Sequence, residues 1–73
     1  MTTKMYTVQA LAYNPYDPDF VRDAENKGIL IETVKEDPVG LALLRLDSPS
    51  KRALQEFVRT HWGDESLVRD IKP

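Results

Sequence analysis

His61 is the only histidine in the sequence, and it is the side chain best suited to proton transfer near neutral pH. It could act as a general base if a cavity formed around it. It stands beside Trp62 at the end of a helix-like apolar stripe. A histidine at such a position more often lies at the boundary of the core or caps the helix end. No Ser-His-Asp or Cys-His arrangement accompanies it, and a lone histidine cannot form a metal site with named partners. The sequence therefore predicts no catalytic residue and no metal ligand.

A second group of polar and aromatic residues surrounds Asn14-Pro15. The loop that carries them could rim a pocket and present phenol and carboxylate groups to a small ligand, from Tyr13, Tyr16, Asp17 and Asp19. A loop of this kind is more often a helix entrance whose aromatic residues pack over the edge of the core. Gln9, on the preceding strand-like segment, adds an amide. The candidate ligand-binding residues are His61, Tyr13, Gln9 and Tyr16.

Metal and cofactor chemistry finds no support elsewhere in the chain. The acidic residues lack the spacing of a calcium-binding loop, and they are better explained as solvating charges and turn residues. There is no cysteine, so neither a disulfide nor a thiolate site is predicted. No glycine-rich phosphate loop is present. We therefore predict no cofactor.

Charge argues against nucleic acid as the main partner. The net charge is −2, whereas phosphate affinity comes mainly from clustered Lys and Arg. Lys51, Arg52 and Arg59 form only a modest basic edge. The sequence also has no signal-peptide pattern and no apolar run near the roughly 20 residues that span a membrane. We therefore expect a cytoplasmic protein without a membrane partner.

The first half of the chain reads as strand, helix, strand. Strand formers fill residues 5–13. Asp17-Pro18 then provides an N-cap and a first helical residue, and Gly28 ends the helix. A second strand is predicted over residues 29–35, followed by a turn over residues 36–40.

The second half repeats this order. A strand over residues 41–47 leads into a helix with an apolar stripe. Its N-cap is Asp47, Ser48 or Ser50. The helix ends at Gly63-Asp64, and residues 67–71 are predicted to form a short last strand. The stripe consists of Ala53, Leu54, Phe57, Val58, His61 and Trp62.

This order predicts a ferredoxin-like βαββαβ sandwich, an α+β fold with a four-stranded antiparallel sheet and two helices on one face. Residues 1–73 form one domain, in which residues 1–4 are expected to be a flexible tail. The helix side of the sheet is assigned Val8, Ala10, Ala42, Leu44 and Leu46. The bare side is assigned Thr7, Gln9, Leu11, Leu41, Leu43 and Arg45.

The bare side is too apolar at its centre for a surface that simply faces water. A domain of this size is also marginally stable on its own. Two-fold dimers are the commonest oligomers, so the simplest cover is a second copy of the chain. The predicted interface residues are Leu11, Leu41, Leu43 and Thr7. If the protein is instead monomeric, this face is a docking surface for a different protein.

The segment from Leu41 to Pro73 resembles the second half of small dimeric α+β barrel proteins. The matching points are Asp47-Ser48-Pro49 before the helix, Trp62 near its end, and Ile71-Lys72-Pro73 at the terminus. The resemblance implies a ferredoxin-like fold and pairing of two sheets face to face. That superfamily includes monooxygenases, isomerases and proteins of unknown role, and no catalytic residue carries over to this chain.

The leading interpretation is a small non-enzymatic interaction or regulatory protein that self-associates through its open sheet face. A second interpretation is a small-molecule-binding protein or barrel-type enzyme with a pocket between facing sheets. A third is an RNA-binding module, although the bare face of residues 41–47 offers no aromatic residue for base stacking.

Overall fold

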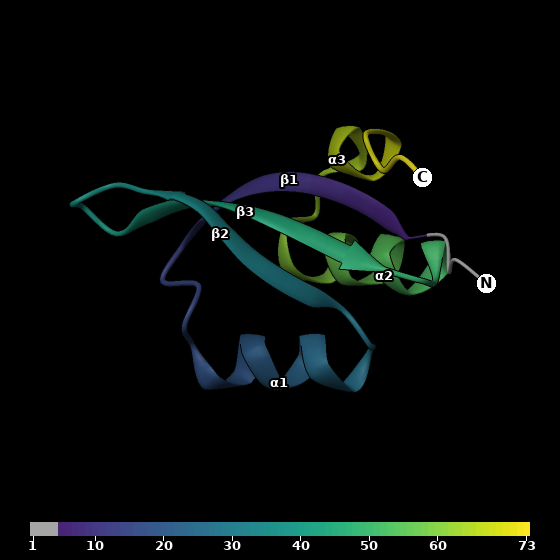
Figure 1. Ribbon diagram of the computed structural model, residues 1–73, viewed down its shortest axis with the longest axis horizontal. Coiled ribbons are helices and arrows are strands. Elements are labelled where there is room, and N and C mark those ends of the chain that lie inside the picture. The colour runs from purple at the N-terminus through teal and green to yellow at the C-terminus, as the bar shows by residue number, and fades with distance from the viewer. Residues whose placement is uncertain (1–4) are drawn as a thin grey trace.

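The computed structural model describes residues 5–73, and the tail expected over residues 1–4 lies outside them. The chain is a mixed α+β domain whose antiparallel sheet has the strand order β1-β3-β2 (Figure 1). In chain order the elements are β1 (Tyr6–Tyr13), α1 (Pro18–Asn26), β2 (Leu30–Glu36), β3 (Leu41–Ser48), α2 (Lys51–His61) and α3 (Glu65–Arg69).

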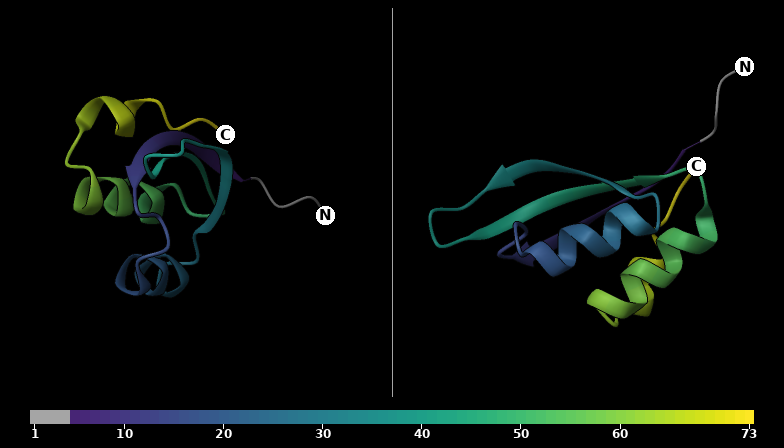
Figure 2. Two further views of the ribbon diagram at one scale, coloured as in Figure 1. Left: turned by 90° about the vertical axis from the view of Figure 1, so that its left-hand side faces the viewer. Right: turned by 90° about the horizontal axis from the view of Figure 1, so that it is seen from below.

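The hairpin of β2 and β3 extends beyond the helices at one end of the molecule (Figures 1 and 2). Asp37 holds its turn, because its carbonyl oxygen accepts from the Gly40 amide at 2.9 Å and its Oδ1 accepts from the Val39 amide at 3.1 Å. Gly40 has a φ of 91°, which glycine adopts without a steric penalty. The register between β2 and β3 shifts between Thr33 and Lys35, so β2 contains a bulge there.

Helices α1 and α2 lie on one face of the sheet, and α3 lies beside β1 (Figure 2). The side chains predicted to face the helices are buried, which confirms the assignment of the two sheet faces. Side chains along a regular strand alternate between the two faces of the sheet. Once one residue is assigned to the correct face, the faces of its neighbours follow. The buried strand residues are Val8, Ala10, Ala42, Leu44 and Leu46.

Both long helices begin where a side chain can accept the free backbone amides of the first turn. Asp17 Oδ1 accepts from the Asp19 amide at 2.9 Å at the start of α1. Of the three candidates for α2, Ser50 is the N-cap, and its Oγ accepts from the Ala53 amide at 3.2 Å. The middle of α2 then buries Leu54, Phe57 and Val58 completely against the sheet.

The predicted fourth strand over residues 67–71 is wrong, because the segment begins inside helix α3. Asp64 Oδ1 caps this helix by accepting from the amide and hydroxyl of Ser66, at 2.9 and 2.6 Å. These hydrogen bonds lower the pKa of the Asp64 carboxyl. Leu67, Val68 and Ile71 fit an i, i+1, i+4 helical stripe as well as a short apolar strand. Over residues 5–73 the sheet therefore has three strands, and three helices pack around it.

What remains of the expected strand is a single bridge at the free edge of β1. Thr7 and Lys72 exchange two backbone hydrogen bonds of 2.7 and 2.9 Å. Further along the same edge, the indole nitrogen of Trp62 donates to the carbonyl oxygen of Leu11 at 2.8 Å. Backbone groups that point away from β3 are therefore paired at both positions, although no full strand lies there.

Candidate functional site

Three leucines form an apolar surface on the face of the sheet opposite α1 and α2, and we call them the leucine patch: Leu11, Leu41 and Leu43. Leu11 of β1 stands directly opposite Leu43 of β3, and it is 58% exposed. Leu41 and Leu43 are half-buried. All three line a surface hollow of about 360 Å³ beside the hairpin turn, together with Lys35, Glu36, Asp37 and Pro38. The patch is contiguous because its members are cross-strand or same-face neighbours.

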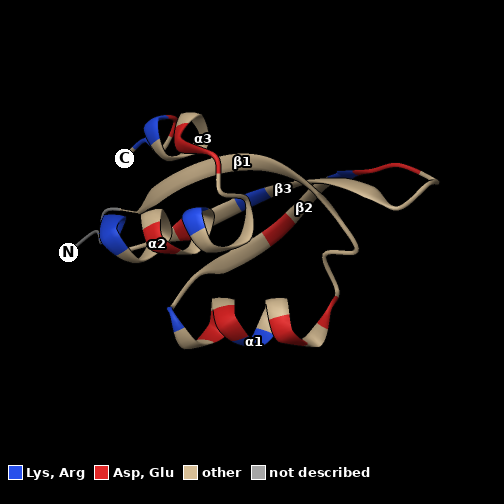
Figure 3. Ribbon diagram, turned by 180° about the vertical axis from the view of Figure 1, so that it is seen from behind, with Lys and Arg blue, Asp and Glu red and all other residues tan. Residues whose placement is uncertain are grey.

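The opposite end of this face is polar. Arg45 pairs with Glu32 at 2.6 Å and with Asp47 at 3.2 Å, and these three charges cross from β2 to β3. Figure 3 shows these coloured bands, whereas β1 is drawn without charge along its whole length. Exposed ion pairs of this kind contribute little to stability, and they suit a solvated surface. The ion pairs therefore gather at the end of the face away from the leucines, which we call the charged half, although the exposed Leu30 also lies there and Lys35 lies beside Leu43.

Thr7 lies in the charged half, apart from the leucines with which it was predicted to form an interface. It is half-buried between Asp47 on β3 and Lys72 at the C-terminal bridge. Its Oγ1 is buried and has no hydrogen-bond partner among the described residues. The structure therefore groups Leu11, Leu41 and Leu43 and separates Thr7 from them.

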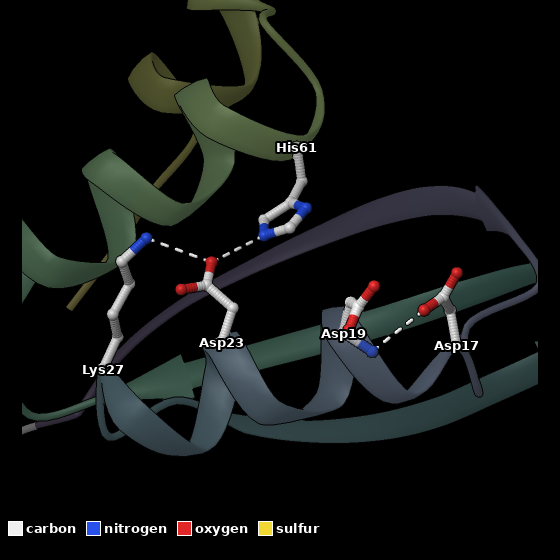
Figure 4. Close-up of polar contacts among 5 residues, drawn as sticks. All are labelled: Asp17, Asp19, Asp23, Lys27 and His61. Carbon is white, nitrogen blue, oxygen red and sulfur yellow. Dashed lines mark hydrogen bonds and ion pairs between the residues drawn. The ribbon is translucent and has the colours of Figure 1, made fainter.

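A second candidate site surrounds His61 at the C-terminal end of α2. His61 Nε2 lies 2.7 Å from Asp23 Oδ2 on α1, and Lys27 Nζ contacts the same oxygen at 3.0 Å (Figure 4). The imidazole also packs against Phe20 and Phe57, with ring centroids 5.0 and 4.4 Å apart. These contacts fix the ring at the junction of the two helices.

The protonation state of Asp23 follows from this arrangement. Hydrogen bonds from His61 and then Lys27 lower the pKa of the Asp23 carboxyl below its ordinary value of 3.8. Asp23 is therefore ionised at neutral pH and can only accept hydrogen bonds. The proton in its contact with His61 must come from Nε2, which leaves Nδ1 as the second polar atom of the ring.

This contact gives a pH prediction for folding stability. A depressed native pKa stabilises the fold above the unfolded value, and the contribution is lost as the pH falls through the native pKa. We expect Asp23→Asn to be less stable than the parent chain at pH 7. The difference should shrink towards zero below the ordinary pKa of 3.8. Urea denaturation of both proteins at pH 7 and pH 3 measures it, and an equal difference at both pH values would contradict the role of the Asp23 charge.

His61 and Tyr13 come together, because both line two adjoining surface hollows of about 220 and 390 Å³. The other two predicted ligand residues lie elsewhere. Tyr16 directs its hydroxyl to Glu36 Oε2 at 3.4 Å. Gln9 lines hollows on the far side of Trp62, beside Lys72 or Leu67. The four predicted residues therefore do not form one site.

Two features of the site were missed by reasoning from the sequence. Asp23 was not predicted to contact His61, because nothing local connects it with a histidine 38 positions away. The bond from Trp62 to Leu11 joins residues 51 positions apart. Contacts of this range depend on how α1 and α2 are placed, and no short-range pattern encodes them.

Comparisons of the chain with protein-family models, with curated proteins and with solved structures found no match. Within residues 5–73 no group of three or more His, Cys, Asp or Glu side chains is placed to hold a metal ion. Over the same residues, no helix has the length and apolar character needed to cross a membrane. The function is therefore argued from the surface of the chain itself.

Proposed function

We propose that this chain is a small non-enzymatic interaction protein that self-associates through the open face of its sheet. The observation that supports this function most directly is the leucine patch. Leu11 and Leu43 stand opposite each other on two paired strands, and Leu11 is 58% exposed. Contiguous exposed apolar surface of this kind usually marks an interaction site.

The gain in free energy suits a chain of this size. Burying a leucine side chain completely contributes on the order of 1.5–3 kcal/mol, and the patch supplies part of that for each of three leucines on each copy. A 73-residue domain is expected to have a total stability of only roughly 4–11 kcal/mol. Association through this face therefore adds an amount comparable to the stability of the isolated fold.

The sheet order supports a finer proposal about architecture. We propose that the chain is a reduced ferredoxin-like domain, in which the last strand has shrunk to the bridge between Thr7 and Lys72. The order β1-β3-β2, with this bridge on the outer side of β1, is what such a reduction would leave. Two such domains with their open faces together would resemble the dimeric α+β barrel arrangement.

The absolute mass in solution tests the proposed function. We expect light scattering on a size-exclusion column to give twice the 8.4 kDa of one chain, with dissociation on dilution. A mass of one chain at every concentration would overturn self-association. The chain has no cysteine, so Leu11→Cys and Thr33→Cys variants can locate the contact by disulfide formation. Crosslinking at residue 33 on β2, and not at residue 11, would contradict the assigned face.

A further inference from the structure

The smaller hollow beside His61 has polar atoms that are free to bind a ligand. Asp17 uses Oδ1 to cap α1, and its other carboxylate oxygen accepts no hydrogen bond from residues 5–73. His61 uses Nε2 to hold Asp23, and Nδ1 has no hydrogen-bond partner within the same range. Figure 4 shows Nδ1 pointing away from Asp23. Both side chains line the same hollow of about 220 Å³.

These free atoms share one chemical property, because each is a hydrogen-bond acceptor. An ionised carboxylate only accepts, and the neutral imidazole accepts at Nδ1 when Nε2 carries the proton. Asn14 adds an amide oxygen, which also accepts hydrogen bonds. No Lys or Arg is among the described residues that line the hollow. The nearby cation, Lys27, is already engaged with Asp23.

The remaining lining is aromatic or apolar except at Asn14, which adds a side-chain amide. Phe20 forms one side, Tyr13 another, and Pro15 is buried beneath them. Aromatic ring faces attract cations and also pack against hydrocarbon. A bare metal ion does not fit this lining, because it would need more oxygen or nitrogen ligands than His61, Asp17 and Asn14 provide.

We propose that this hollow is a binding site for a small organic cation, a primary ammonium group carried by a short apolar or aromatic body. The ammonium donates to the free carboxylate oxygen of Asp17 and to Nδ1 of His61. The body of the ligand lies against Phe20 and Tyr13. The volume is below that of a site for a drug-sized molecule, so the ligand has the size of a fragment. This site does not depend on the proposed self-association.

Titration with benzylamine, followed by amide chemical shifts in ¹⁵N-labelled protein, tests the proposal. We expect saturable shifts at residues 12–20 and 61, with a dissociation constant on the order of 1 mM, as for other fragment-sized ligands. Benzyl alcohol and benzoate have similar shapes but carry no positive charge, and they should bind at least about tenfold more weakly. The absence of saturable shifts with benzylamine, or equal binding of benzyl alcohol, would overturn the proposal.

A matched pair of variants separates the site from a general effect of charge. Asp17→Ser removes the carboxylate but keeps an N-cap for α1, so the fold should persist. We expect it to weaken benzylamine binding about tenfold. Asp37→Ser is the control, because it removes the same charge at a residue that does not line the hollow, in the hairpin turn. Like Asp17, Asp37 accepts a hydrogen bond from the backbone amide two residues later. Equal weakening by both variants would overturn the site, whatever mass light scattering gives for the protein.

Discussion

Replacing Leu43 with Asp should convert the self-associated protein into a folded monomer. Leu43 lies at the centre of the leucine patch, opposite Leu11 on β1 and Lys35 on β2. In a face-to-face pair the new carboxylate would be buried away from water, near the same carboxylate of the second chain. This burial costs several kcal/mol. In the monomer it stays in water within reach of Lys35. We expect the dissociation constant, measured by light scattering across dilutions, to rise at least about 100-fold.

The matched control is Leu30→Asp on β2. Leu30 is also an exposed leucine of the sheet, with 63% of its surface accessible, but it pairs with Asp47 in the charged half of the face. This variant should keep the mass of the parent protein. If Leu43→Asp remains associated and Leu30→Asp does not, the interface lies at the other end of the sheet. Circular dichroism of both variants confirms that the fold is retained.

Truncating Phe57 to Ala should remove most of the folding stability. Phe57 is completely buried, and its ring packs against Phe20 of α1 and against His61 and Trp62. Phe→Ala substitutions in a core cost about 3–5 kcal/mol, because apolar burial is lost and a cavity remains. For a domain of this size that loss approaches the whole free energy of unfolding. Urea denaturation followed by circular dichroism measures the change.

Val39→Ala is the control for this substitution. Val39 lies in the hairpin turn and is 74% exposed, so its truncation should change the free energy of unfolding by less than about 0.5 kcal/mol. A loss below about 1 kcal/mol in Phe57→Ala would mean that the contact between α1 and α2 contributes little. The helices would then be held mainly by their separate contacts with the sheet.

The sheet faces and the starts of both long helices could be predicted because they depend on local rules. Strand alternation assigned Leu44 and Leu46 to the core and Leu43 to the open face, and all three lie there. The Asp17-Pro18 pair started α1 at the predicted residue, because an N-cap acts within its own turn.

The end of the chain could not be predicted in the same way. Leu67, Val68 and Ile71 satisfy both helical and strand spacing over so short a stretch. Asp64 favours the helix, because its Oδ1 accepts hydrogen bonds from the amide and the hydroxyl of Ser66 and so caps α3. The sequence had assigned Asp64 to the end of the preceding helix, and its capping geometry appears only once α2 has stopped. The predicted ligand site was wrong for a related reason. Gln9 and Tyr16 have polar side chains suited to a ligand, but the fold places them away from His61.

The two borders of the sheet differ, and this limits what the protein can build by adding strands. The outer side of β1 is occupied by Lys72 and by the indole of Trp62, so an incoming chain finds no continuous row of donors and acceptors there. Within residues 5–73, the outer side of β2 at the other border pairs with no strand and carries no comparable bridge. Two copies joined along β2 would present an occupied border at each end. Addition of strands along β2 is therefore expected to favour a pair of copies over a longer array.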